Sequence, residues 1–475
     1  MSSSPLPLCY IALGGNVGDR LRSLTRALCS LRELEGVTVR RTSSLFTTKG
    51  QYVAEQPPFL NAIVEVELSQ ERLDNLPGVI DALKGIEASV GRTPGVRRGP
   101  RVVDLDIVAV GEQTFSSSSG PYPLEVPHQL MHERDFVLVP MAQLAPEWRH
   151  PLRPGNPTVK AMLEALKTSE SLPAGASLAD IPVQVIPAAG GLHGRSDGAL
   201  FHRGEKTLVM GILNATPDSF SDGGDHLEVE AAVAAAVDMV TAGADILDIG
   251  GESTRPGAAE VPPEEEIKRV APVVKALREC GITATISVDT RKAAVAKAAV
   301  EAGADWINDV SGGEFDPDML RTAAELMAPV VLMHMRGTPA TMKSLTTYDR
   351  GVTEEVMEQL EARRRAAEAA GVATWNIMLD PGIGFAKEFE HNLELLRRCG
   401  EMVERLQPAP ILIGTSRKRF IGTILNEPEP KKRVFGNAAT VTASIAGNAD
   451  IVRVHEVLEM VQTARVSDKI YRNCV

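Results

Sequence analysis

The sequence has no excess of positive charge and no cysteine pattern, and both absences limit its function. The formal net charge is −12 and the isoelectric point is about 5.4. Without a basic surface, binding to nucleic acid or to an anionic membrane is not expected. The 5 cysteines are an odd number and show no CxxC spacing. Neither a disulfide framework nor a zinc site is therefore predicted.

Long apolar segments and targeting signals are also missing. No apolar run reaches about 18 residues, so no membrane-spanning helix is expected. The first strand-like run, residues 8–16, starts close to Met1 and leaves no room for a signal or transit peptide. These observations favour the cytoplasm, with the mitochondrion as the alternative. The chain also has no Gly-Lys dipeptide, so a Walker A loop is excluded and any nucleotide must be held in another way.

The C-terminal part of the chain has the pattern of an eight-stranded α/β barrel. Eight short apolar runs alternate with helix-like stretches such as residues 227–243. In such a barrel, polar residues at the carboxyl ends of the strands meet at the catalytic face. The polar residues that follow the eight runs are Asn214, Asp248, Asp289, Asn308, His334, Asp380, Ser416 and His455.

A chain of this length suits two or three domains. Residues 166–200 are rich in Gly, Pro, Ala and Ser, which predicts a linker with ill-defined limits. We therefore expect an N-terminal domain over residues 5–165 and the barrel over residues 201–475.

The N-terminal domain contains two aspartates on one face of a predicted strand. Asp104 and Asp106 alternate with apolar residues, so their carboxylates point the same way. Neighbouring like charges are tolerated when a divalent cation lies between them, and oxygen ligands suit Mg²⁺. Arginines lie just upstream in a Gly/Pro-rich loop and could bind a polyphosphate: Arg92, Arg97, Arg98 and Arg101. The alternative interpretation is a solvated edge strand with an acidic face.

Four N-terminal segments together resemble 6-hydroxymethyl-7,8-dihydropterin pyrophosphokinase over about residues 8–155. They read YIALGGNVGDR (10–20), PPFLNAIVEVE (57–67), GPRVVDLDI (99–107) and VPHQLMHERDFVLVP (126–140). The resemblance implies a ferredoxin-like α+β fold, transfer of the terminal diphosphate of ATP to a pterin hydroxymethyl group, and Mg²⁺ as the metal. Bacterial members carry Trp where this chain has Arg98, which leaves open how the neighbouring loop closes.

The same resemblance implies roles for individual residues. Asp104 and Asp106 would hold two magnesium ions, and Arg92 and Arg101 would bind the transferred phosphates. Glu87 and His128 would lie on the ATP side. Phe59 and Phe136 would sandwich the pterin ring, a flat heterocycle that stacks well between aromatic rings, and Asn61 would bind its edge. Without these motifs, the two phenylalanines would be interpreted as ordinary core residues and His128 as a turn residue.

The barrel motifs are similar to those of dihydropteroate synthase over about residues 205–475. They include NATPDSFSDGG (214–224), DIGGESTRPGA (248–258), DPGIGF (380–385), GTSRKRFIG (414–422) and RVHEV (453–457), in the order of that family. The resemblance implies a TIM barrel that joins hydroxymethyl-dihydropterin diphosphate to p-aminobenzoate and releases pyrophosphate.

Each barrel motif implies a part of that site. Asp289, Asn308 and Asp380 would bind the pterin edge, with Phe385 and Met335 over its face. The pyrophosphate groups would be Asn214 with Mg²⁺, Arg255, Arg453 and His455, with Thr254 adding a hydroxyl. Lys418 would reach the pterin, Ser416 the aminobenzoate carboxylate, and Phe220 and Pro256 would wall the aminobenzoate ring. As an alternative, Arg453 and His455 could simply close the last barrel strand.

The product of the first family is the substrate of the second, so the chain resembles the bifunctional folate-synthesis enzymes of plants and protists. Two other functions would call for different residues. A pterin-binding barrel that transfers methyl groups to a corrinoid would have no use for the STRPG and SRKR motifs. A regulatory pseudoenzyme would be expected to have lost Asp104, Asp106 and Asn214. Association through the barrel into a homodimer or a higher oligomer is expected by resemblance, whereas transfer of the intermediate between the sites is not predicted either way.

Overall fold

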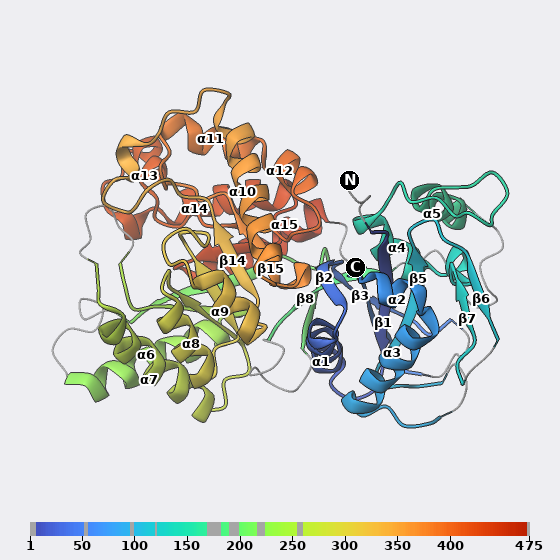
Figure 1. The fold of residues 1–475 in the computed structure, drawn as a ribbon. Helices are drawn as coiled ribbons and strands as arrows, with labels where there is room; N and C mark the ends of the chain where they lie inside the picture. Colours follow the sequence, from blue (N-terminus) through green and yellow to red (C-terminus); the bar gives the residue numbers. More distant parts are fainter. Residues whose placement is uncertain are drawn as a thin grey trace. The chain divides into compact units, whose positions relative to one another are not determined.

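The computed structural model describes residues 6–51, 56–95, 99–118, 121–168, 182–189, 199–215, 224–253 and 260–472, with side chains from residue 229 in α6. The chain forms two compact units, and each is described here by itself (Figure 1). Six candidate site residues of the sequence analysis lie outside the described residues: Arg97, Arg98, Phe220, Thr254, Arg255 and Pro256.

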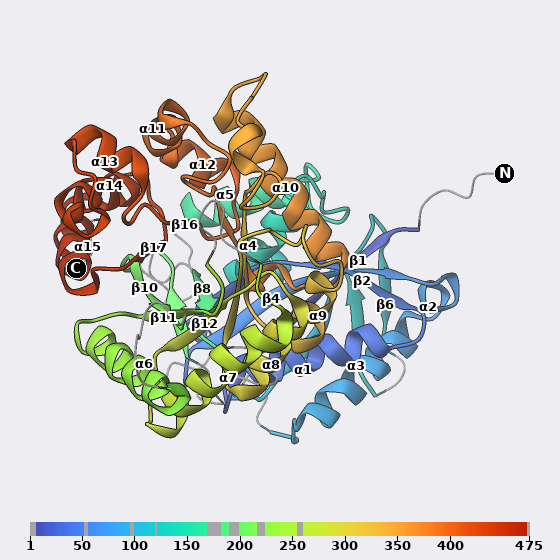
Figure 2. The ribbon, with the colours of Figure 1, turned by 90° about the vertical axis from the view of Figure 1, so that its left-hand side faces the viewer.

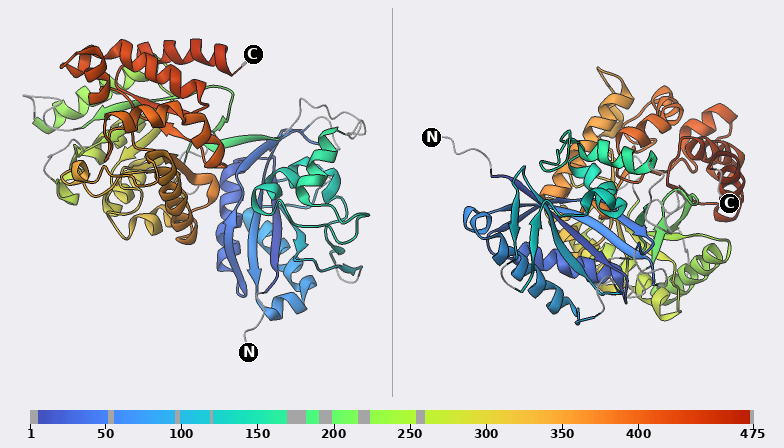
Figure 3. Two further views of the ribbon diagram at one scale, coloured as in Figure 1. Left: turned by 90° about the horizontal axis from the view of Figure 1, so that it is seen from above. Right: turned by 90° about the vertical axis from the view of Figure 1, so that its right-hand side faces the viewer.

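The first unit is an antiparallel sheet with helices on both faces (Figure 3). Its strands pair in the order β5-β1-β4-β3-β8-β9, and β2 pairs with β4. The strands are β1 (Leu8–Gly15), β2 (Val37–Thr42), β3 (Leu45–Thr48), β4 (Phe59–Leu68), β5 (Asp104–Val110), β8 (Val183–Pro187) and β9 (Leu200–His202), with a separate hairpin of β6 (Phe115–Ser117) and β7 (Leu124–Val126). The helices are α1 (Arg20–Glu33), α2 (Gln70–Asp74), α3 (Leu76–Val90), α4 (Asp135–Leu144) and α5 (Val159–Thr168).

Strand alternation divides this sheet into two faces. In β5, Leu105 and Ile107 are buried, whereas Asp104 and Asp106 are only partly buried. The buried Val108 shares the aspartates' face and packs with Leu138 and Met141 of α4. The predicted alternation of β5 is therefore confirmed, and it turns both carboxylates to the face that α4 covers.

The segment predicted as a linker contains a strand of the first sheet. β8 pairs with β3 in antiparallel register, with Leu45 opposite Val185. The three apolar residues Val183, Val185 and Ile186 were too few to stand out among the surrounding Gly, Pro and Ala residues. The domain limits stay a prediction, but residues 183–187 belong to the first compact unit.

The second unit is a parallel eight-stranded barrel with helices outside it (Figure 2). The strands are β10 (Leu208–Asn214), β11 (Ile246–Gly250), β12 (Thr285–Asp289), β13 (Trp306–Asp309), β14 (Val330–Met333), β15 (Ile377–Asp380), β16 (Leu412–Ile413) and β17 (Ile451–Val454). The helices are α6 (Gly224–Thr241), α7 (Pro263–Glu279), α8 (Ala293–Ala302), α9 (Met319–Leu326), α10 (Val352–Ala369), α11 (Phe389–Arg397), α12 (Cys399–Arg405), α13 (Arg419–Leu425), α14 (Val434–Ala446) and α15 (Val457–Tyr471).

Parallel pairing runs in sequence order from β10 to β15, and β17 lies between β10 and β16. A bridge from Leu379 to Ile411 joins the two ends of this order and closes the barrel. Gly303 ends α8 with a φ of 118°, which permits the sharp turn into β13. The predicted barrel is confirmed. Asp248 lies within β11 rather than at its end, because that strand continues to Gly250.

Candidate functional sites

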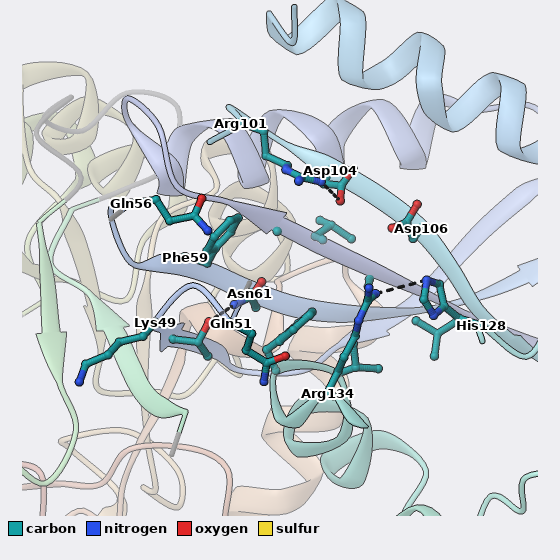
Figure 4. A pocket seen from close by; sticks show the side chains of 17 residues that line it. Lys49, Gln51, Gln56, Phe59, Asn61, Arg101, Asp104, Asp106, His128 and Arg134 are labelled. Atoms are coloured by element: carbon teal, nitrogen blue, oxygen red, sulfur yellow. Dashed lines mark hydrogen bonds and ion pairs between the residues drawn. The ribbon is translucent and has the colours of Figure 1, made fainter. Parts of the chain in front are cut away.

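The first unit contains a pocket over the α4 face of its sheet, with a cavity of about 170 Å³ (Figure 4). The predicted residues that line it are Phe59, Asn61, Arg101, Asp104, Asp106, His128 and Phe136. These residues come from β4, β5 and the loop that precedes it, the turn before α4, and α4 itself. Their convergence brings together the predicted stacking rings, the edge-binding amide and the acidic pair.

At one end of the pocket, Asn61 is held for contact with a ligand. Its Nδ2 donates to Thr48 Oγ1 at 2.7 Å, and the residue is 5% exposed. Gly14 on the neighbouring strand β1 makes room for it, because a Cβ at Gly14 would lie 2.7 Å from Asn61 Oδ1. Phe59 and Phe136 are half-buried, and the Arg134 guanidinium lies 5.5 Å from the Phe136 ring centroid.

At the other end, three carboxylates alternate with three cations. Arg92 bonds both Glu87 and Asp104, and Arg101 donates to Asp104 Oδ2 at 2.7 Å. Lys84 Nζ lies 3.2 Å from Asp106 Oδ1 and 2.7 Å from Glu87 Oε1. The neighbouring cations outweigh burial and hold the pKa of the Asp104 carboxyl below its usual range. Asp104 is therefore ionised, and the two side chains together present hard oxygen donors of the kind that Mg²⁺ prefers.

Glu87, predicted to lie on the ATP side, has protein partners for both of its oxygens. Oε1 accepts from the Leu105 backbone N–H at 2.7 Å and Oε2 from Arg92. The residue is 3% exposed. His128 also makes protein contacts: its Nδ1 accepts from Leu130 N at 3.1 Å, and its Nε2 lies 3.2 Å from Arg134. Burial and the Arg134 charge lower the pKa of His128.

Several pocket residues were not predicted. They are Thr48, Lys49, Gln51, Gln56, Arg134 and, next to the acidic pair, Lys84. Arg134 stood within a quoted motif. The only sequence signal for Lys84 was its i,i+3 spacing from Glu87, which places the two side chains on one face of α3. Within the described ranges, no group of three or more His, Cys, Asp or Glu side chains is arranged to hold a metal ion by itself.

The barrel rim brings a second set of predicted residues together. Arg453 on β17 donates to Asp248 Oδ2 at 2.5 Å and to Asp289 Oδ2 at 2.6 Å. Asn308 on β13 donates to the same Asp248 oxygen at 2.9 Å. The other oxygen of Asp248 is buried and has no hydrogen-bond partner among the described residues. This polar network crosses the interior of the barrel and links β11, β12, β13 and β17.

Two carboxyls of this rim have strongly shifted pKa values. Burial raises the pKa of Asp289 to about 7, although Arg453 lowers it. Burial also raises the pKa of Asp380 to about 6, although Gly382 N donates to its Oδ1 at 2.7 Å. Opposite Asp380, burial and Arg453 lower the pKa of Lys418 to about 8. Shifts of this kind concentrate at functional sites.

The remaining predicted residues surround this network. Lys418 Nζ lies 4.1 Å from the Phe385 ring centroid, and Met335 belongs to a small apolar cluster against which Phe385 packs. Ser416 Oγ lies 2.9 Å from His455 Nδ1 and also donates to Glu456. Asn214 is exposed at the end of β10.

The sequence analysis did not name Lys387 as a site residue. It lies in the loop after β15, close to His334 at the end of β14. Its Nζ is 2.9 Å from His334 Nδ1 and donates to the Phe385 carbonyl at 3.0 Å. Burial lowers the pKa of both Lys387 and His334 well below their usual ranges. The pair ties the loop after β15 to the end of β14, and a lysine in a GFAK sequence carried no signal of this contact.

Comparison with known proteins identifies the family. A model described as pterin binding enzyme matches residues 210–455, and one described as 7,8-dihydro-6-hydroxymethylpterin-pyrophosphokinase matches residues 10–146. A folate synthesis bifunctional protein of Arabidopsis thaliana is 39% identical over 482 residues, which cover 96% of this chain and 95% of the relative. The chain belongs to the family of bifunctional folate-synthesis proteins.

Other members of the family are longer than this chain. The folic acid synthesis protein of Schizosaccharomyces pombe is 40% identical over 98% of the chain, and that of Pneumocystis carinii is 39% identical over 98%. The chain spans about 60% of the length of these two relatives, 59% and 60% respectively.

Solved structures of the family agree with both units. A Xanthomonas albilineans dihydropteroate synthase with 4-aminobenzoic acid shares 43% identity, with a TM-score of 0.53 over 57% of this chain and 96% of that one. A wild-type Plasmodium falciparum HPPK-DHPS with pteroate has a TM-score of 0.78 over 99% and 98% of the two chains. At 21% identity, the latter shows the shared fold alone.

The Arg453 network predicts a measurable contribution to barrel stability. Arg453→Met would leave Asp248 and Asp289 without their shared cation, and their side chains are 0% and 10% exposed. Removing one partner of a buried ion pair costs about 3 kcal/mol or more. We expect the free energy of unfolding to fall by about that amount, measured by hydrogen exchange of the β11 and β12 amides. The matched control is Lys275→Met, which removes an exposed pair with Glu279 and should change little. Equal stability of both variants would contradict this role of Arg453.

Proposed function

We propose that the chain catalyses two consecutive steps of folate synthesis. The N-terminal unit transfers diphosphate from ATP to 6-hydroxymethyl-7,8-dihydropterin. The barrel then joins the resulting pterin diphosphate to p-aminobenzoate, with 7,8-dihydropteroate and pyrophosphate as products. The observation that supports the proposal is that one chain carries both motif sets, and that many of their described residues lie together within their own unit: around the pocket of the first unit and at the barrel rim of the second.

In the first step, Phe59 and Phe136 stack on the pterin, and Asn61 binds its edge. The pterin hydroxyl oxygen attacks the β-phosphorus of ATP, and the bond to the α-phosphate oxygen breaks so that AMP leaves. Arg92 and Arg101 bind the transferred phosphates, where negative charge accumulates. Mg²⁺ bound by Asp104 and Asp106 supplies charge neutralisation and polarises the phosphoryl oxygens.

In the second step, Asp380, Asn308 and Asp289 bind the amide and amino groups of the pterin edge. Each buried edge group left unpaired would cost about 1 to 3 kcal/mol. The C–O bond to the diphosphate breaks with its electron pair on oxygen, and the aniline nitrogen of p-aminobenzoate forms the new C–N bond and then loses a proton. Arg453 and His455 bind the leaving pyrophosphate, Asn214 contributes a metal ligand there, Lys418 covers the pterin, and Ser416 binds the aminobenzoate carboxylate. Arg255, Thr254, Phe220 and Pro256 complete the proposal by resemblance.

A coupled assay tests the whole proposal. Purified protein with ATP, hydroxymethyl-dihydropterin, p-aminobenzoate and Mg²⁺ should form AMP and dihydropteroate in equal amounts. Omitting p-aminobenzoate should stop dihydropteroate formation and leave AMP formation intact. AMP without any dihydropteroate, even with added pterin diphosphate, would contradict the barrel half of the proposal.

The raised pKa of Asp380 predicts how pterin binding depends on pH. The carboxylate accepts hydrogen bonds from the pterin edge, so binding requires the ionised form, which predominates above pH about 6. Below that pH the ionised fraction falls about tenfold per unit. We expect the dissociation constant of a fluorescent pterin in the barrel to rise accordingly between pH 6 and pH 5. Asp380→Asn should make this dependence shallower and leave only the part that comes from Asp289, whose pKa is raised to about 7. An unchanged profile in that variant would contradict the assignment.

We further propose that the chain forms a homodimer through the barrel. Apolar side chains exposed on α14 and α15 support this, among them Phe435 (89% exposed), Val466 (63%) and Ile470 (62%).

Among the described helices, none has the length and apolar character needed to cross a membrane. For the compartment we propose the cytoplasm, with the mitochondrion as the alternative, since relatives in pea and Arabidopsis are named mitochondrial and another in Arabidopsis is not.

A further inference from the structure

Lys84 is the third cation of the acidic cluster, and unlike Arg92 and Arg101 it bonds to the backbone of β5 as well as to carboxylates. It projects from the middle of α3, its side chain is 15% exposed, and its ammonium donates to three acceptors. These are Glu87 Oε1 at 2.7 Å, the Leu105 carbonyl at 2.8 Å and Asp106 Oδ1 at 3.2 Å. An ammonium has three N–H donors, so all of them are used.

The contact with Leu105 fixes Lys84 to the strand that carries both aspartates. β5 lies at one end of the sheet order and pairs only with β1 along it. On its other side, Lys84 binds the carbonyl of Leu105 and Glu87 binds its N–H at 2.7 Å. Both backbone polar groups of the residue between Asp104 and Asp106 are thus satisfied by one lysine–glutamate pair, and an unpaired buried group there would be costly.

The two arginines bind carboxylate side chains of the cluster, and Arg101 also donates to the Gly99 carbonyl at 3.1 Å. Arg92 and Arg101 flank a Gly/Pro-rich segment, their side chains are 28% and 19% exposed, and both are bound to Asp104. An arriving triphosphate offers them stronger, bidentate partners, so they can exchange Asp104 for phosphate. Lys84 cannot exchange its partners for phosphate in the same way. If its ammonium moved away, the Leu105 carbonyl and Glu87 Oε1 would lose a hydrogen-bond donor.

We propose that Lys84 is a fixed internal cation that weakens the binding of a free divalent cation at Asp106, so that the metal is held firmly only when nucleotide has drawn the arginines away. The inference rests on the proposed function of the first unit. In the structure, the three carboxylates Glu87, Asp104 and Asp106 pair with three cationic side chains. A divalent cation entering this neutral cluster gains little and meets the Lys84 charge beside its ligand. Lys84 is a positioning residue, since it acts through Asp106 and Leu105.

The test measures metal binding without catalysis. Mn²⁺ serves as the probe, and its free concentration is followed by electron paramagnetic resonance in titrations of the full chain without nucleotide. Lys84→Gln keeps a donor for the Leu105 carbonyl but removes the charge, and Lys84→Met removes both. We expect both variants to bind Mn²⁺ about tenfold more tightly than the wild type, and Lys84→Arg to bind like the wild type. The matched control is Lys167→Gln on α5, where the side chain is 45% exposed.

Each outcome decides for or against the proposal. Unchanged or weaker Mn²⁺ binding in both neutral variants would overturn it. Loss of the folded state in both, seen by circular dichroism, would also overturn it, by assigning Lys84 to stability instead of metal affinity. If the wild-type protein makes AMP but Lys84→Gln binds Mn²⁺ like the wild type, only this inference is refuted. If the wild-type protein makes no AMP from ATP and pterin, the proposed function is refuted.

Discussion

Asp104→Asn or Asp106→Asn should reduce AMP formation by at least about 100-fold, a loss of about 2.7 kcal/mol in transition-state stabilisation. An amide is a neutral and weaker ligand for Mg²⁺ than a carboxylate. At Asp104 the change also removes the charge to which both arginines are bound, so Arg101 loses its carboxylate partner and Arg92 keeps only Glu87. Condensation of supplied pterin diphosphate with p-aminobenzoate should continue at the wild-type rate.

AMP release is the measurement, with dihydropteroate formation followed in parallel. Asp81→Asn is a suitable control, because Asp81 lies on α3 close in sequence to Lys84 but is exposed to solvent. Wild-type AMP formation in either variant would exclude the aspartate pair as the metal site. Equal loss of both reactions would mean that the substitution had disturbed the chain as a whole.

Asp380→Asn should remove dihydropteroate formation by a similar factor, at least about 100-fold in kcat/KM. Asparagine has nearly the same shape, so Gly382 N can still donate to its side-chain oxygen, as it does to Asp380 at 2.7 Å. The amide nitrogen, however, presents a donor where the pterin edge also presents donors, and a buried donor facing a donor is costly. The largest loss is expected in binding of the pterin diphosphate.

Conversion of ATP to AMP should stay near the wild-type rate in this variant, since Asp380 belongs to the barrel. Asp238→Asn, on an exposed position of α6, provides the matched control in the same unit. Full condensation activity in Asp380→Asn would exclude Asp380 as the pterin acceptor. The pH series described above then distinguishes loss of the carboxylate from a general loss of folding.

Much of the barrel was predictable because its elements are local. Each strand is a short apolar run and each outer helix has its own periodicity, so the sequence indicates the order of units without any knowledge of long-range contacts. Polar residues after such runs were expected at one rim, and the structure joins Asp248, Asp289, Asn308 and Arg453 there in one network. The roles of individual residues came from motif resemblance and stay predictions.

The first unit was harder to predict, because its sheet depends on pairing between distant segments. β8 was hidden within the expected linker: a five-residue strand at residues 183–187 gains its partner, β3, from a segment about 140 residues earlier. Chain distance carries no signal of such a pairing, since closing a long loop costs little more than closing a shorter one.

By itself, the sequence determined which residue types stand at which strand ends, the alternation that turns Asp104 and Asp106 to one face, and the order of motifs that indicates two pterin sites. Only the tertiary structure decided their partners. Glu87 bonds to the Leu105 backbone and to Arg92. Lys84 contacts Asp106, and Lys387 contacts the loop after β15. The physical reason is that a flexible charged side chain reaches any acceptor within several ångströms of its backbone, and which acceptor lies there depends on how α3 packs beside β5 and how the loop after β15 packs beside β14.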